Sequence, residues 1–169
     1  MKKLLFLSMI IFSLALKANA GDGDILIKGS AGIAIQKTAW ANLGLEWETK
    51  YHNAWEIYAD FGTGFKYCEI DQTYLCNETF FDYKSFGVGG AYKPKFYRWK
   101  NLNLRGQFGV DLGVKEGNTF FLSLVVGPEL TYTFKCNVQL FILQKNEFCF
   151  WCRDHFRNGV MLGIKIPLN

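Results

Sequence analysis

The sequence is poor in the residues and patterns on which most catalytic sites depend. It has only two histidines, His52 and His155, and no G-x-S-x-G, H-E-x-x-H or P-loop pattern. It has only three prolines, and no apolar run of about 18 residues follows the first twenty residues. The mature chain therefore has no candidate membrane-spanning helix, and we expect neither an enzyme nor a bound cofactor.

The N-terminus has the three parts of a secretory signal. Two lysines precede an uncharged apolar stretch over residues 4–16, and Ala18 and Ala20 frame a cleavage site. We therefore predict a signal peptide over 1–20 and a single domain over 21–169. The signal contains three lysines and no acid, so the net charge falls from +4 to +4 − 3 = +1. A nearly neutral domain gives no reason to expect direct binding of nucleic acid.

Aromatic residues and glycine are abundant, with 16 Phe, 8 Tyr, 5 Trp and 17 Gly. This composition favours strands, and apolar and polar residues alternate with a period of two from Trp55 to Tyr67 and again from Leu102 to Lys115. Eight strands are predicted, at 24–36, 39–49, 55–67, 84–93, 102–115, 121–134, 138–146 and 158–168. The pattern predicts an all-β protein, an eight-stranded antiparallel up-and-down transmembrane β-barrel.

The predicted connections alternate between short and long. Short inner turns are expected at 51–53, 97–101 and 135–137, and outer connections near Lys37 and at 68–82, 116–118 and 147–157. Short periplasmic turns opposite longer external loops are typical of barrels in the bacterial outer membrane. We therefore expect that location.

Alternation alone also fits a soluble, lipocalin-like barrel with its apolar face inward. Three features favour the opposite orientation: glycines on the polar face, charges of both signs on that face, and aromatic residues near the strand ends. A narrow lumen would then hold paired charges, because an unpaired buried charge is costly. The predicted network comprises Glu46, Glu56, Asp60, Lys66, Arg105, Asp111, Lys115, Glu129 and Lys165.

Five cysteines lie in the predicted mature domain. Cys68 and Cys76 bracket the second outer loop, and Cys149 and Cys152 form a C-x-x-C in the fourth. Redox chemistry would need a helix N-terminus beside the thiol, and zinc would need two further ligands. We expect structural disulfides among these four, within or between the two pairs, no metal site, and a free Cys136.

The whole mature pattern resembles the small outer-membrane barrels of the OmpX and OmpA-barrel type, although those barrels usually end in an aromatic residue and this chain ends in Asn169. The segments 86–93, 104–113 and 163–169 also resemble the TraO family of conjugal transfer proteins. The second resemblance implies a role in conjugative DNA transfer and assigns no catalytic residue.

These observations predict a structural or interaction component of the outer membrane. Its partners would be membrane lipid and other envelope or transfer-apparatus proteins. Three alternatives stay open: a lipid-modifying enzyme at the outer rim built around His155 and Ser85, a narrow pore for small apolar solutes, and a soluble lipocalin-like binder.

Overall fold

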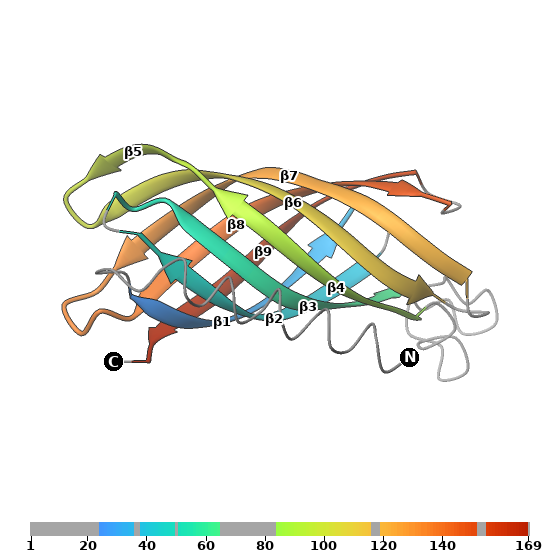
Figure 1. Ribbon diagram of the computed structural model, residues 1–169, viewed down its shortest axis with the longest axis horizontal. Coiled ribbons are helices and arrows are strands. Elements are labelled where there is room, and N and C mark those ends of the chain that lie inside the picture. Colours follow the sequence, from blue (N-terminus) through green and yellow to red (C-terminus); the bar gives the residue numbers. More distant parts are fainter. Residues whose placement is uncertain are drawn as a thin grey trace, which may run out of the picture.

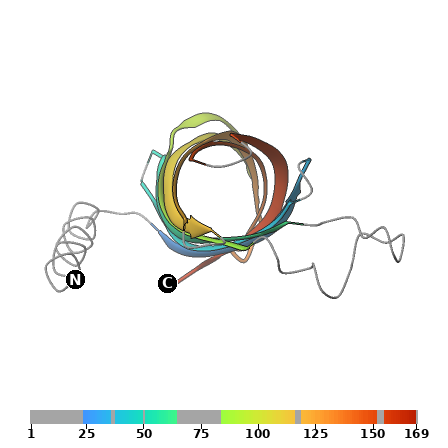
Figure 2. The same ribbon diagram turned by 90° about the vertical axis from the view of Figure 1, so that its right-hand side faces the viewer.

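The described residues form one closed antiparallel sheet. The computed structural model describes residues 24–35, 38–49, 51–64, 84–115, 119–151 and 155–168, so the predicted signal peptide lies outside them. The strands are β1 (Ile25–Ala34), β2 (Thr38–Glu48), β3 (Ala54–Gly64), β4 (Lys84–Lys93), β5 (Lys95–Trp99), β6 (Leu102–Lys115), β7 (Thr119–Thr133), β8 (Gln139–Phe150) and β9 (Phe156–Pro167). Strands that follow one another pair, except that β4 and β5 both pair with β6, and β1 pairs with β9, which closes the ring seen in Figure 2.

The barrel has eight strand positions because β4 and β5 share one. Both pair with β6, and Pro94 separates them. Proline has no backbone N–H to donate, and the register shifts between Lys95 and Tyr97. The predicted strand at 84–93 is confirmed as β4, but β5 was not predicted, and the turn that follows β5 is Lys100–Asn101 rather than 97–101. The predicted eight-stranded antiparallel fold is confirmed.

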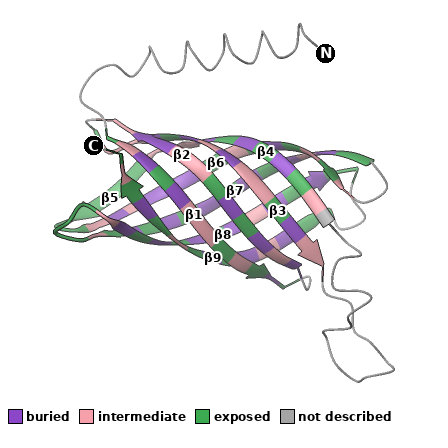
Figure 3. Cartoon of the chain, turned by 90° about the horizontal axis from the view of Figure 1, so that it is seen from below, coloured by how far each residue is buried: buried purple, intermediate pink, exposed green. Residues whose placement is uncertain are grey.

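Burial alternates along the strands, and charged side chains face the interior. Figure 3 shows the alternation as bands of buried and exposed residues around the barrel. In β8, Lys145, Glu147 and Cys149 are buried, whereas Phe148 and Phe150 are exposed. This alternation continues to Phe150, so the predicted outer loop at 147–157 is wrong and the connection spans only 151–155. Within the described residues, no helix is long and apolar enough to cross a membrane.

Glycines on the inner face make room for large rings. A Cβ added to Gly89 would lie 2.7 Å from the ring of Tyr58, and one added to Gly163 would lie 2.6 Å from the ring of Phe141. Real Cβ atoms do not approach other atoms so closely. The small residues therefore let an eight-stranded lumen hold side chains that would otherwise not fit.

The two ends of the barrel differ. The turns after β2, β5 and β7 are short and lie at one end, which we call the turn end (Figure 1). Backbone hydrogen bonds close them, for example from Thr49 to Asn53 at 2.8 Å and from Phe134 to Val138 at 2.9 Å. The opposite end, the loop end, carries the connections after β1, β3, β6 and β8. Residues 65–83 of the second connection lie outside the described residues.

Candidate functional site

The lumen near the turn end contains a cluster of charged side chains that we call the turn-end cluster. Its members are Lys28, Glu46, Glu48, Glu56, Lys93, Arg105, Glu129 and Lys165. They come from seven strands, so the closure of the barrel brings them together. The cluster contains four cations and four carboxylates, and its formal charge is zero.

Two lysines link the carboxylates of the turn-end cluster. Nζ of Lys93 lies 2.7 Å from Glu46, 2.5 Å from Glu56 and 2.6 Å from Glu129. Nζ of Lys165 lies 2.8 Å from Glu46 and 2.5 Å from Glu129. The side chains of these five residues are fully buried. Because every carboxylate faces at least one ammonium, the pairing offsets the cost of removing the charges from water.

The remaining members extend this network to the wall and the rim. Lys28 lies 2.7 Å from Glu56. Arg105 lies 2.7 Å from Glu46 and 2.8 Å from Glu48, which is slightly exposed at the rim. The planar guanidinium presents donors in a fixed fork. Arg105 therefore joins a deeply buried carboxylate to one near the turns.

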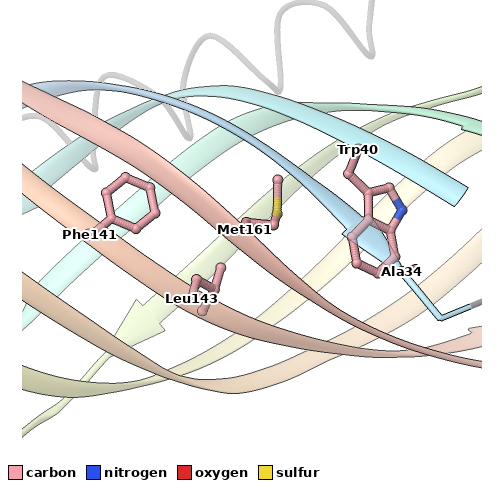
Figure 4. Close-up of a cluster of buried hydrophobic side chains, with 5 residues drawn as sticks. All are labelled: Ala34, Trp40, Phe141, Leu143 and Met161. Carbon is pink, nitrogen blue, oxygen red and sulfur yellow. The ribbon is translucent and has the colours of Figure 1, made fainter.

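An apolar cluster lies between the charged groups. Ala34, Trp40, Phe141, Leu143 and Met161 pack together inside the barrel, from β1, β2, β8 and β9 (Figure 4). Nζ of Lys28 lies 4.8 Å from the centre of the Phe141 ring, and Nζ of Lys145 lies 4.8 Å from the Trp40 ring. A cation over an aromatic face is attracted by the ring electrons. Each end of the apolar cluster therefore contacts a different group of charges.

The second group of charges, the loop-end cluster, is smaller. It consists of Asp60, Asp111, Lys145, Glu147 and Arg157. Lys145 lies 2.5 Å from Asp60, but 3.8 Å from Asp111 and 3.9 Å from Glu147. Tyr58 donates a hydrogen bond to Asp111. Among the described residues, three carboxylates here face two cations.

The structure places the predicted network residues in three locations. Glu46, Glu56, Arg105, Glu129 and Lys165 lie in the turn-end cluster, and Asp60 and Asp111 lie in the loop-end cluster. Lys66 lies outside the described residues. Lys115 lies at the loop end, where its ammonium donates to the backbone oxygen of Trp151 at 2.7 Å, and its part in the lumen network stays a prediction. Lys115 is the last residue of β6.

Sequence reasoning missed several network residues, namely Lys28, Lys93, Lys145, Glu147 and Arg157. Lys28, Lys93 and Lys145 lie in predicted strands but were not assigned to the lumen. Glu147 and Arg157 were assigned to a loop. The period of two was a usable signal, because Glu147 has the same parity as the buried Phe141, Leu143 and Lys145.

The cysteines and histidines form no common site. Cys136 is free and exposed. Cys149 is buried and disulfide-bonded, but Cys68, Cys76 and Cys152 lie outside the described residues, so the pairing stays a prediction. His52 at the turn end lies 2.7 Å from Glu48, and His155 is at the loop end. No group of His, Cys, Asp and Glu in the described part of the chain could hold a metal ion.

Comparison with known proteins identifies the fold. No family model matches the chain, and no curated protein matches it. A major outer membrane protein from Thermus thermophilus matches over 87% of this chain and 100% of its own, with 10% identity and a TM-score of 0.64. The chain has the fold of a transmembrane β-barrel. A de novo designed transmembrane β-barrel also matches, over 89% of this chain and 99% of its own, with 13% identity and a TM-score of 0.53. None of these comparisons supports the resemblance to the TraO family.

Proposed function

We propose that the protein spans the bacterial outer membrane as a closed barrel and acts as a structural or interaction component rather than as a pore. The observation that carries this proposal is the turn-end cluster, whose central ion pairs are fully buried across the lumen. A conducting path would have to separate charges that lie 2.5–2.8 Å apart. A barrel filled in this way acts through its two ends and its outer wall.

The outer wall supports the membrane location. Large apolar side chains are exposed on every side, among them Ile33 at 69%, Leu43 at 60% and Leu162 at 60%. An apolar band of this extent would promote aggregation in water. In a bilayer it faces hydrocarbon, while the closed sheet satisfies the backbone polar groups. The lipocalin-like alternative requires the opposite orientation of the two faces.

Aromatic pairs near both ends of the barrel agree with a membrane-spanning wall. The rings of Trp55 and Tyr92 lie 4.7 Å apart near the turn end, and those of Phe120 and Trp151 lie 6.4 Å apart near the loop end. Aromatic side chains of this kind favour the two membrane–water interfaces. The two groups would therefore lie at opposite faces of the hydrocarbon layer.

The described contacts do not favour an enzyme at the rim. His155 contacts the backbone oxygen of Cys149 at 3.4 Å, and no contact of its ring with a serine or a carboxylate is found among the described residues. We therefore infer that the protein is not an enzyme and that its partners are membrane lipid and other envelope proteins. The role in conjugative transfer stays a prediction.

Cell fractionation followed by electrophoresis tests the proposal. Protein from the outer-membrane fraction should migrate differently in SDS gels with and without boiling, because a folded barrel stays compact until heated. Planar-bilayer recordings of the same material should show no conductance steps. Recovery in the soluble fraction without a mobility shift would refute the membrane location, and discrete conductance steps would refute the closed lumen.

A further inference from the structure

The outer wall of the barrel has a hollow over Gly90 in β4. Its volume is about 810 Å³, which lies within the range of about 300–1,000 Å³ that is typical of ligand pockets. Trp55, Tyr92, Phe108, Val110 and Val126 line it, from β3, β4, β6 and β7. Glu56 also borders the hollow, but its carboxylate is held in the lumen by Lys28 and Lys93. The occupant must therefore be apolar.

Gly90 creates the hollow, and internal packing does not require a glycine there. Gly90 pairs with the outward-facing Ile57 and Val110. A Cβ added to Gly90 would meet only a backbone oxygen of Glu56, at 3.7 Å, which is an ordinary contact. The inward-facing Gly89 differs, because a Cβ there would collide with the ring of Tyr58. The space over Gly90 is thus open to a molecule from outside the barrel.

We propose that the hollow binds an acyl chain of an anionic phospholipid, with the lipid phosphate beside Lys95 and Arg98. This inference rests on the proposed membrane location, because the hollow is continuous with the apolar wall that a bilayer would cover. Hydrocarbon fits its lining, since burial of apolar surface drives binding in such a site. An acyl chain held in a recess contacts more of the wall than one lying on a smooth barrel.

The position of the basic residues supports an anionic headgroup. Trp47 and Trp55 line the aromatic end of the hollow and flank the turn between β2 and β3. The backbone N–H of Lys95 donates to the side chain of Asn53 in this turn at 2.9 Å, and the Arg98 guanidinium contacts His52. Both basic side chains are exposed, and neither forms an ion pair with a carboxylate in the described residues. A phosphate at this level would be attracted by both.

Trp47 gives a second indication of a lipid. Its side chain is buried, and its indole N–H has no hydrogen-bond partner among the described residues. A buried donor without an acceptor is costly. An ester carbonyl of the bound phospholipid lies between phosphate and acyl chain, and it would supply the missing acceptor once the Trp47 ring turns its N–H toward the hollow.

Photo-crosslinking to a lipid tests the proposal. The full barrel is reconstituted in phosphatidylcholine vesicles that contain a small share of phosphatidylglycerol with a diazirine in its acyl chain, and adducts are mapped by mass spectrometry. We expect adducts to concentrate at Val110 and Val126, although Leu162 on the opposite wall is more exposed, at 60% against 44% and 39%. The pair of substitutions Lys95→Gln and Arg98→Gln should remove the preference for this lipid over a photoactivatable phosphatidylcholine.

Two matched variants separate the hollow from the rest of the wall. Gly90→Phe should lose most adducts at Val110 and Val126. Gly29→Phe should keep them, because Gly29 also faces outward and an added Cβ would meet nothing within 4 Å. Co-flotation with the vesicles, measured on each sample, shows whether the barrel has inserted.

The outcomes distinguish the lipid site from the proposed function. Insertion with adducts that follow exposure alone, or that survive in Gly90→Phe, overturns the lipid site only. A preference for a photoactivatable lipid A overturns it in favour of lipid A. Failure of the wild type to float with the vesicles overturns the membrane location and, with it, the lipid site.

Discussion

The turn-end and loop-end clusters both pair buried charges inside the lumen, but they differ in how closely the charges are paired. The turn-end cluster matches four cations with four carboxylates, and its central ion pairs measure 2.5–2.8 Å. The loop-end cluster has one short pair, between Lys145 and Asp60 at 2.5 Å, and its other pairs measure 3.8–3.9 Å. The side chains of Lys145, Asp111 and Glu147 are also buried, at 1–2% exposure, so the longer distances do not follow from contact with water. The comparison indicates that the turn end closes the lumen and that the loop end tolerates looser pairing of its charges.

Removal of the central cation should produce the largest effect. Lys93→Met would leave the buried carboxylates of Glu46, Glu56 and Glu129 short of one positive charge. Breaking a buried network by removing one partner costs about 3–5 kcal/mol. Urea unfolding of the barrel in lipid vesicles should show a loss of this size. A loss below that of the loop-end variant Lys145→Met would contradict the difference between the clusters.

The corresponding change in the loop-end cluster should cost less. Lys145→Met removes one close partner, that of Asp60, which is partly exposed and also accepts a hydrogen bond from Asn42 at 3.4 Å. Hydrogen bonds to charged groups contribute about 1.5–3 kcal/mol, and we expect a loss in this range in the same unfolding experiment. A loss equal to that of Lys93→Met would show that removal of a cation costs the same stability in both clusters.

Neutralising a carboxylate of the loop-end cluster should have a smaller effect again. Asp111→Asn keeps an acceptor for the hydroxyl of Tyr58 and gives up only a 3.8 Å pair with Lys145. We expect a change of no more than about 1 kcal/mol. Glu129→Gln is the matched variant at the turn end, where Lys93 and Lys165 lie 2.6 and 2.5 Å away. Its loss should be clearly larger, and equal losses would count against the account.

Substitution of Lys115 should have the smallest effect on stability. Its ammonium contacts only a backbone oxygen, that of Trp151, in the described residues. Exposed surface substitutions usually change stability by less than about 0.5 kcal/mol. Lys115→Ala should therefore unfold at nearly the wild-type urea concentration. A large loss would place Lys115 in the lumen network that the sequence predicted for it.

The sequence predicted the fold and part of the lumen because apolar and polar residues alternate clearly in strands whose outer face is apolar and whose inner face is polar. In β6, Arg105 and Asp111 stand opposite an unbroken apolar face, and both were assigned to the lumen. In β8 the alternation is obscured, because Phe141 and Leu143 point inward while Gln144 points outward. An apolar layer inside a barrel cannot be distinguished from an outer wall by period alone.

The pairing of charges could not be predicted for a different reason. Lys165 contacts Glu46 across 119 positions of sequence, and Arg105 contacts the same carboxylate across 59. These contacts depend on strand register and on the closure of β1 against β9. Neither leaves a local trace in the sequence. The sequence likewise did not predict β5, which follows Pro94 and pairs with β6 after a register shift.

The orientation of the two faces is the central claim, and spin labelling along β8 in lipid vesicles tests it most directly. Single cysteines would be placed at successive positions from 139 to 148 in a variant whose native cysteines are serine, after the boiling-dependent mobility shift has been verified for that variant. The account predicts that contact with lipid-soluble oxygen alternates, with maxima at Leu140, Ile142 and Phe148 and minima at Phe141, Leu143 and Glu147. Maxima at the second set, or no alternation, would contradict it.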